Sequence, residues 1–139
     1  MQKPKKILLV EDNYADAELT RIAFRNQAIT NEIIHCKDGK EALSYMRDNA
    51  IDNIKYALFD LNMPKLNGLE LLKICKRDPL FQRLPIIVFT TSANHTDVEE
   101  CYQNGANAYV LKPVDLEDFD QAILAIHNFW GEVNIPGNA

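Results

Sequence analysis

The sequence predicts an α/β fold in which helices cover both faces of a parallel β-sheet. Five short runs rich in Ile, Val and Leu alternate with segments whose apolar residues recur at helical spacing. Nearly continuous apolar strands are typical of parallel sheets that are buried on both faces. The chain has 139 residues, 47% of them hydrophobic and 25% charged, so it is long enough for one ordinary domain with a packed core.

The apolar runs predict five strands, at residues 6–10 (KILLV), 32–36 (EIIHC), 56–60 (YALFD), 85–89 (PIIVF) and 108–112 (AYVLK). A helical segment follows each run, which makes the pattern a βα unit repeated five times. Right-handed crossovers leave few topologies for such a chain, and ligands bind outside the carboxyl ends of its strands. The residues that follow each strand are therefore the first candidates for a functional site.

Apolar residues at spacings of three and four predict the five helices. The groups are Ala15, Leu19, Ile22 and Ala23; Ala42, Leu43 and Met46; Leu71, Leu72 and Cys75; Val98, Cys101 and Tyr102; and Leu116, Phe119, Ile123, Ile126 and Trp130. Asp38 and Thr96 each stand three residues before a Glu, which predicts a capping box at the start of a helix. Asp115 is a third expected N-cap, and Asn104-Gly105 predicts the end of the fourth helix.

The composition argues against several kinds of partner and compartment. A net charge of −5 disfavours a phosphate-backbone footprint on nucleic acid, which usually needs a basic face. The longest apolar runs hold about five residues, too few to span a membrane, and we expect no signal peptide. Cys36, Cys75 and Cys101 form no C-x-x-C pair, so we expect small buried hydrophobes in a reducing cytoplasm.

Chemically active residues follow four of the five predicted strands. The first ends in Glu11-Asp12, the third in Asp60, the fourth in Thr90-Thr91 and the fifth in Lys112-Pro113. Clustered carboxylates repel one another, and a hard divalent cation such as Mg²⁺ removes that conflict. Asp60 can then act as a nucleophile toward phosphorus, while the metal ion and Lys112 neutralise the phosphoryl oxygens.

Each of these features also has a purely structural interpretation. Glu11-Asp12 is a candidate cap for the helix near Ala15, Lys112 a solvated lysine at a strand end, and Pro113 a residue that blocks helix formation. Any one feature alone favours this interpretation. Their joint occurrence at the correct strand ends and in the correct order favours the functional one.

Four stretches resemble the receiver domains of two-component response regulators: ILLVEDN, LFDLNMPKLNG, IIVFTTS and GANAYVLKPVD. The resemblance covers about residues 5–130 and implies a flavodoxin-like (βα)5 sandwich with sheet order 2-1-3-4-5. It implies a single receiver domain over 1–139, with a short tail at 131–139. The stretches RDPLFQRLPIIVFTTS and AIHNFWGEVNIPG further resemble single-domain regulators associated with bacterial phytochromes and hybrid sensors.

The same resemblance implies a role for each residue at the strand ends. Asp60 matches the phosphoacceptor, and Glu11 and Asp12 match the acidic pair that holds Mg²⁺ or Mn²⁺. The remaining matches are the backbone carbonyl of Asn62 as a further metal ligand, Thr90 as the switch hydroxyl, Tyr109 as the switch aromatic, Lys112 as the invariant lysine, and Lys112–Pro113 as a cis peptide bond. Asn62 and Ser92 match positions that tune the lifetime of the phosphoryl group.

Three functions compete on these observations. The leading one is a signalling switch that is phosphorylated by a histidine kinase or a phosphotransfer protein. An aspartate-nucleophile phosphohydrolase needs an acid two residues after its nucleophile, where this chain has Asn62. A degenerate receiver that serves only as a scaffold would lack Asp60, Lys112 or the acidic pair. We therefore expect no enzyme activity beyond the protein's own phosphorylation and dephosphorylation.

The C-terminal region raises the question of output. Residues 131–139 are too few for a DNA-binding domain, so we expect either that a surface of this domain contacts another protein or that the domain acts as a phosphate relay or sink. Phe129 projects about 100° away from Trp130 around the helix, so one of these rings is expected at the surface. The first part of the last helix is expected to be buried against the sheet. Either the segment NIPG covers the exposed ring, or a homodimer forms through the last helix and the fifth strand.

Overall fold

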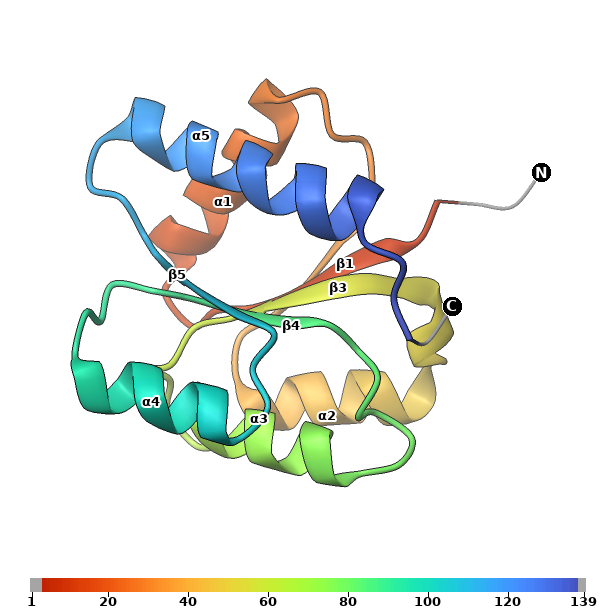
Figure 1. Cartoon of the computed structure of the whole chain (residues 1–139). Helices are drawn as coiled ribbons and strands as arrows, with labels where there is room; N and C mark the ends of the chain where they lie inside the picture. Colours follow the sequence, from red (N-terminus) through yellow and green to blue (C-terminus); the bar gives the residue numbers. More distant parts are fainter. Residues whose placement is uncertain (1–3, 138–139) are drawn as a thin grey trace.

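Five parallel strands form the central layer of the structure, a computed structural model that describes residues 4–137 (Figure 1). The strands are β1 (Lys6–Val10), β2 (Ile33–Cys36), β3 (Ile54–Phe59), β4 (Ile86–Thr90) and β5 (Ala108–Leu111). Their order is β2-β1-β3-β4-β5, and every neighbouring pair is parallel. The predicted flavodoxin-like topology is thus confirmed.

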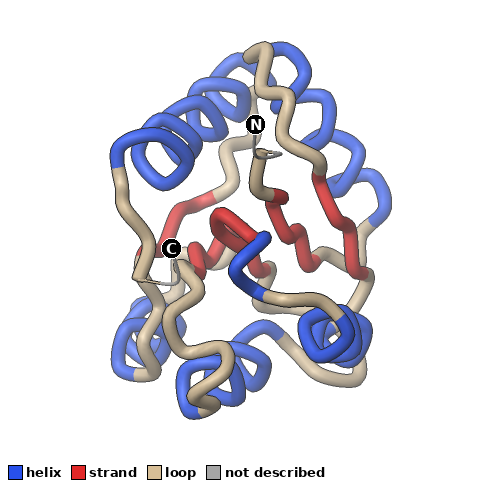
Figure 2. The backbone as a smooth tube through the Cα atoms, turned by 90° about the vertical axis from the view of Figure 1, so that its right-hand side faces the viewer, coloured by secondary structure: helices blue, strands red, loops and turns tan. Residues whose placement is uncertain are grey.

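Helices form a layer on each side of this sheet, as Figures 1 and 2 show. The helices are α1 (Tyr14–Asn26), α2 (Gly39–Asp48), α3 (Gly68–Arg77), α4 (His95–Gln103) and α5 (Leu116–Ile126). Helices α1 and α5 cover one face, and α2, α3 and α4 cover the other. A short 3₁₀ helix (Ile51–Asn53) precedes β3, and a π-helical segment (His127–Val133) continues α5.

The core consists of two apolar layers separated by the sheet. In β3, Tyr56 and Leu58 contact the layer under α1 and α5, whereas Ala57 and Phe59 contact the layer under α2, α3 and α4. Successive residues of a strand point to opposite faces, so a strand in the middle of the sheet needs apolar residues at every position. This requirement explains why the predicted strands are continuous apolar runs.

The predicted helix ends are mostly confirmed. The Asp38 side chain caps α2 through the Glu41 N–H, and the Asp115 side chain caps α5. Gly105 has a φ of 96°, a backbone conformation suited to glycine at the end of α4. The predicted Thr96 cap is wrong: the Asn94 side chain accepts a hydrogen bond from the Thr96 N–H at 2.8 Å, so Thr96 already lies within the first turn.

The last helix differs from expectation at its start and agrees near its end. Leu116 is 64% exposed, because it lies in the first turn of α5, after the chain has left β5 at Leu111. Phe129 is 48% exposed while Trp130 packs against the core, so one of the two aromatic rings does remain at the surface. Within residues 4–137, no helix is long and apolar enough to cross a membrane.

Candidate functional site

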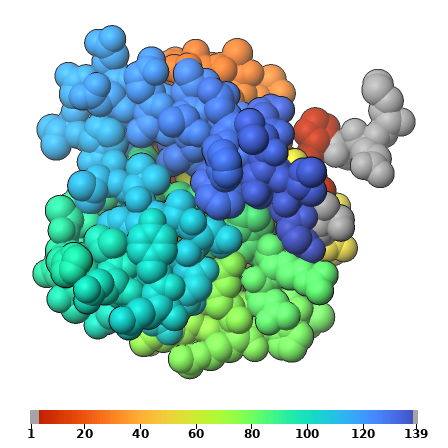
Figure 3. Space-filling view, viewed as in Figure 1, coloured from red at the N-terminus to blue at the C-terminus, as the bar shows by residue number. Residues whose placement is uncertain are grey.

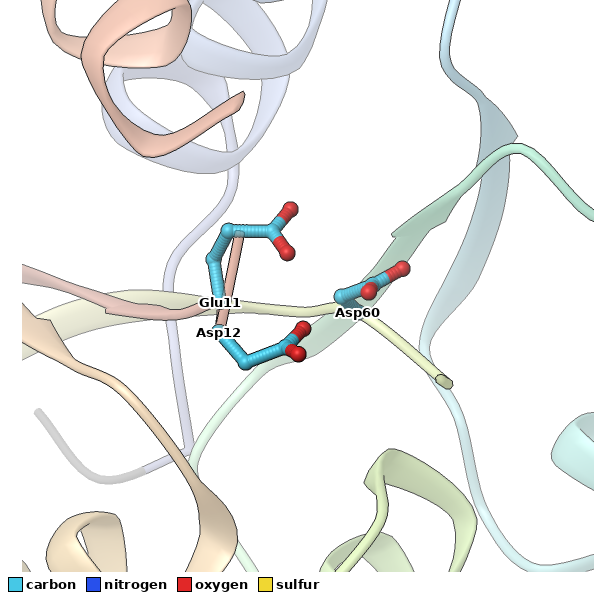
Figure 4. Close-up of side chains that lie close together, drawn as sticks. All are labelled: Glu11, Asp12 and Asp60. Carbon is cyan, nitrogen blue, oxygen red and sulfur yellow. The ribbon is translucent and has the colours of Figure 1, made fainter. Parts of the chain in front are cut away.

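The carboxyl ends of β1 and β3 bring three acidic residues together. Glu11 and Asp12 follow β1, and Asp60 follows β3. The Asp60 N–H donates to the Val10 carbonyl at 3.0 Å, which holds the two strand ends side by side. One carboxylate oxygen from each acid lies within 4.8 Å of the others, and Figure 4 shows the carboxylates of Glu11 and Asp12 extending toward Asp60. The predicted acidic cluster is therefore present in the fold.

Two of the three acids in this cluster are buried, and burial makes the ionised form of Glu11 less favourable. Glu11 is 1% exposed and Asp60 is 9% exposed, while Asp12 faces solvent. Burial raises the pKa of Glu11 to about 7, although the hydrogen bond from Lys112 opposes the shift. Three oxygen donors with one open side suit a hard divalent cation that keeps some of its waters. The residues present therefore fit Mg²⁺ or Mn²⁺.

Lys112 is the cation of the site and contacts three carboxylates. Its Nζ donates to Glu11 Oε1 and to Asp16 Oδ2, the latter at 3.3 Å, and lies 3.7 Å from Asp60 Oδ1. Burial alone would lower the pKa of Lys112, but the hydrogen bond to Glu11 and the nearby carboxylates raise it above the usual value. Lys112 therefore stays charged within reach of Asp60.

Asp16 is a site residue that sequence reasoning missed. It lies in the first turn of α1, which begins at Tyr14, with Asn13 between Tyr14 and the acidic pair Glu11-Asp12. Its backbone N–H is capped by the Asn13 side chain at 3.0 Å. The signal in the sequence was an acid one turn beyond Glu11-Asp12, on a helix that starts at the same edge of the sheet.

The β4 end places the predicted switch residues around one loop. Thr90 is fully buried, and its Oγ1 accepts a hydrogen bond from the Ser92 N–H at 3.4 Å. The Tyr109 hydroxyl donates to the Ser92 carbonyl at 2.7 Å, and burial raises the pKa of Tyr109. Within the described part of the chain, no hydrogen bond joins Thr90 to Asp60. Thr90 and Tyr109 are thus both connected to Ser92.

The loop after Asp60 turns back on itself and leaves Asn62, two residues after Asp60, exposed. Leu61 and Met63 are buried and anchor the loop, whereas Asn62 between them is exposed. The Gly68 N–H donates to the Leu61 carbonyl at 3.1 Å. A Cβ atom at Gly68 would overlap the backbone carbonyl of Asp60, so only glycine allows the loop to return this closely.

The predicted cis bond between Lys112 and Pro113 is wrong, because no peptide bond among residues 4–137 is cis. The trans form is the ordinary preference for a bond before proline, by about 0.5–1 kcal/mol. The backbone N–H of Lys112 still bonds to the Thr90 carbonyl at 2.8 Å. The ammonium group of Lys112 reaches Glu11 in this trans arrangement.

Comparisons with known proteins agree with this geometry. FilR2 of Methanothrix harundinacea, described as a probable methanogenesis regulatory protein, is 37% identical over 142 residues, covering 99% of this chain and 92% of that protein. Response regulator Rcp1 of Synechocystis sp. is 36% identical over 138 residues, covering 96% of this chain and 94% of that protein.

Two solved structures share the fold over almost their full length. The phosphorylated cyanobacterial phytochrome response regulator RcpA has a TM-score of 0.88 and 35% identity, covering 97% of this chain and 99% of that chain. The Mn²⁺-bound form of Rcp1 has a TM-score of 0.84 and 35% identity, covering 96% of this chain and 99% of that chain. Residues 7–124 also match the family described as the response regulator receiver domain. With the sheet order, the acidic cluster and these matches in agreement, the chain belongs to the response regulator receiver domain family.

Proposed function

We propose that this chain accepts a phosphoryl group on Asp60 from a histidine kinase or a phosphotransfer protein. The observation that carries the proposal is the position of Asp60 between two further acids and one buried lysine. Phosphorylation and binding of Mg²⁺ or Mn²⁺ are typical of the family to which the chain belongs. We further propose that residues 1–139 form one receiver domain, of which residues 138–139 and 1–3 lie outside the described part.

The metal ligands in this proposal are Glu11, Asp12, Asp60 and the backbone carbonyl of Asn62. Three clustered carboxylates, two of them buried, support this ligand set because their mutual repulsion needs a cation. When bound, Mg²⁺ supplies positive charge for the phosphoryl oxygens. Lys112 supplies the second positive charge, from a position 3.7 Å from Asp60 Oδ1.

The transfer step needs only the Asp60 carboxylate as a nucleophile. One of its oxygens forms a bond to phosphorus while the phosphorus–nitrogen bond of a donor phosphohistidine breaks, and the electron pair returns to the imidazole nitrogen. Lys112 stabilises the oxygens that carry charge in the transition state. Water attack on the same phosphorus later restores the carboxylate and releases inorganic phosphate. Since Asn62 cannot protonate a leaving group, the chain acts only on its own phosphoryl group.

The proposed response to phosphorylation involves Thr90 and Tyr109. A phosphoryl oxygen on Asp60 is a new acceptor for the Thr90 hydroxyl, and movement of Thr90 changes the space available to Tyr109. Asn62 and Ser92 lie two residues after Asp60 and Thr90 and are proposed to tune the lifetime of the phosphoryl group. The exposure of Asn62 and the hydrogen bond of the Ser92 N–H to Thr90 support this role.

The proposed partners are proteins, in the cytoplasm. The net charge of −5 supports an output that does not involve nucleic acid, and the free buried cysteines suit a reducing compartment. A homodimer through α5 and β5 is supported by large apolar side chains that are exposed on or near these two elements. These side chains are Tyr102 (50% exposed), Leu111 (47%), Val114 (fully exposed) and Leu116 (64%). Figure 3 shows that the segment holding β5 and α5, in blue tones, forms part of the molecular surface on this side.

Intact-mass measurement after incubation with Mg²⁺ and acetyl phosphate tests the acceptor. Wild type should gain one phosphoryl group that is lost in mild base, and the gain should disappear when the metal is chelated. Asp60→Asn should gain none, whereas Asp52→Asn, an exposed acid before β3, serves as the matched control and should behave as wild type. Equal incorporation in wild type and Asp60→Asn would rule out Asp60 as the acceptor.

A further inference from the structure

Ser92 connects three parts of the structure through its polar atoms. Its N–H donates to Thr90 Oγ1 at 3.4 Å, and its carbonyl accepts from the Tyr109 hydroxyl at 2.7 Å. Its own hydroxyl donates to Asp97 Oδ2 at 2.6 Å. Thr90 belongs to β4, Tyr109 to β5 and Asp97 to α4, so one residue joins both switch side chains to a helix.

The hydrogen bond between Ser92 and Asp97 is the strongest of these contacts by chemical type. Its acceptor is a carboxylate, both residues are half-buried, and the 2.6 Å distance is typical of a charge-assisted bond. Ser92 Oγ also accepts the Asn94 N–H at 3.3 Å, just before α4 begins. The Ser92 hydroxyl therefore bonds both to the N-cap residue of α4 and to Asp97 in its first turn, and so holds the loop after β4 against the start of this helix.

We propose that Asp97 is a positioning residue that holds Ser92, and through it Thr90 and Tyr109, in the unphosphorylated arrangement. The inference rests on the proposed function of Asp60. It assigns to Asp97 the role of opposing the rearrangement of Thr90 and Tyr109 that follows phosphorylation. In this proposal Thr90, which has no hydrogen bond to Asp60 among the described residues, turns toward the phosphoryl oxygen, and it keeps the Ser92 N–H only if the Ser92 backbone follows. That movement withdraws the Ser92 carbonyl from Tyr109 and the Ser92 hydroxyl from Asp97.

The free energy needed to move the Ser92 backbone determines what fraction of the protein is in the conformation that is phosphorylated readily. A hydrogen bond to a charged acceptor corresponds to a factor of about ten or more in a conformational equilibrium. Loss of the Ser92–Asp97 bond should therefore raise the rate constant of Asp60 phosphorylation by acetyl phosphate about tenfold. Ser92→Ala removes the same bond from its other end and should produce a similar increase.

Two simpler roles of Asp97 predict different results. Its negative charge could merely repel the anionic donor, or it could only stabilise the first turn of α4 through the helix dipole. Asp97→Asn separates the first role from the proposal, because it removes the charge but keeps an oxygen acceptor for Ser92. Glu99→Ala is the matched charge control, since Glu99 lies on the same helix and forms an ion pair with the exposed His95 at 2.9 Å.

The experiment measures phosphorylation rate constants by intact mass, with Mg²⁺ and acetyl phosphate, for six proteins. These are wild type, Asp97→Ala, Asp97→Asn, Ser92→Ala, the Ser92→Ala/Asp97→Ala double variant and Glu99→Ala. We expect about a tenfold increase in Asp97→Ala, Ser92→Ala and the double variant, with no further gain from combining them. Asp97→Asn should show a clearly smaller increase than Asp97→Ala, because it keeps a neutral hydrogen bond to Ser92, and Glu99→Ala should stay close to wild type.

Three outcomes would overturn the inference. Equal increases in Asp97→Ala, Asp97→Asn and Glu99→Ala would assign the effect to charge alone. An Asp97→Ala effect that persists in full on the Ser92→Ala background would assign it to the helix rather than to Ser92. Unchanged phosphorylation rates in both Asp97→Ala and Ser92→Ala would show that the hydrogen bond between Ser92 and Asp97 does not oppose the switch. If wild type itself gains no phosphoryl group on Asp60, the proposed function fails instead, which the same data reveal.

Discussion

The Tyr56 hydroxyl and the His127 Nδ1 atom share a hydrogen bond of 2.9 Å, although 71 residues separate them along the chain. His127 Nε2 lies 3.5 Å from Glu132, and the imidazole packs edge-on against Phe24. Gly131 follows one turn later, where a Cβ atom would overlap the imidazole ring. The buried imidazole therefore joins the end of the last helix to the central strand β3.

This imidazole should make the stability of the fold depend on pH. Burial lowers the pKa of His127, while Glu132 opposes the shift and Lys55 adds to it. Below the ordinary histidine pKa of about 6.5, the unfolded chain binds a proton that the folded chain does not. The contribution of His127 to the free energy of unfolding is therefore largest above about pH 6.5. It decreases as the pH falls toward the lowered pKa that His127 has in the folded state.

Urea denaturation at about pH 7.5 and about pH 5.5 measures this contribution. Wild type should lose more stability between the two pH values than His127→Gln does. Glu11 and the other titrating groups are present in both proteins, so the difference between them isolates His127. Identical losses would show that the imidazole does not titrate differently on folding.

Asn62 is predicted to control how quickly the phosphoryl group is lost. In Asn62→Arg a long side chain at this exposed position should exclude water from the phosphorylated Asp60. We expect the dephosphorylation rate to fall about tenfold, equivalent to about 1.4 kcal/mol of barrier, with metal affinity nearly unchanged. Asn128→Arg, at an exposed position after α5, is the control. An unaltered phosphoryl lifetime in Asn62→Arg would contradict the prediction.

Thr90 is predicted to transmit phosphorylation rather than to accept the phosphoryl group. Thr90→Ala should still incorporate phosphate at Asp60, because the three acids and Lys112 remain. It should lose the phosphorylation-dependent part of its affinity for a partner, since no hydroxyl is left to turn toward the phosphoryl oxygen. Pull-down assays with and without a phosphoryl mimic measure this difference. Partner binding that still depends on the mimic in Thr90→Ala would exclude the role.

Self-association should depend on the apolar side chains of β5 and α5. Sedimentation at micromolar concentration should show a wild-type dimer that Leu111→Ser/Leu116→Ser weakens by at least about tenfold, since both side chains are exposed in one molecule. Leu80→Ser is the control, because Leu80 is 72% exposed on the turn after α3.

Sedimentation of a separate Phe129→Ser variant tests whether the exposed Phe129 ring belongs to the same dimer interface. Trp130 packs against the core and is left unchanged, because its replacement would also destabilise the fold. A wild type that stays monomeric both with and without phosphorylation would rule out the dimer.

Much of the fold followed from local patterns in the sequence. Strands that are buried on both faces must be apolar at every position, and helices with one buried face must repeat at three and four residues. The alternation of the two patterns leaves few topologies. Because parallel strands bring their carboxyl ends to one edge, the sequence alone predicts that Glu11, Asp12, Asp60 and Lys112 lie together.

The remaining features depended on distances between elements that no local pattern encodes. The approach of Asp16 to Lys112 requires a particular position of the first turn of α1 relative to the end of β5, across 96 residues of sequence. The choice of Asn94 over Thr96 as helix cap and the hydrogen bond between Ser92 and Asp97 depend on the path of one loop. Side chains of similar chemistry compete for such contacts, and differences of a few tenths of an ångström decide which bond forms. Only the packed tertiary structure determines distances of that size.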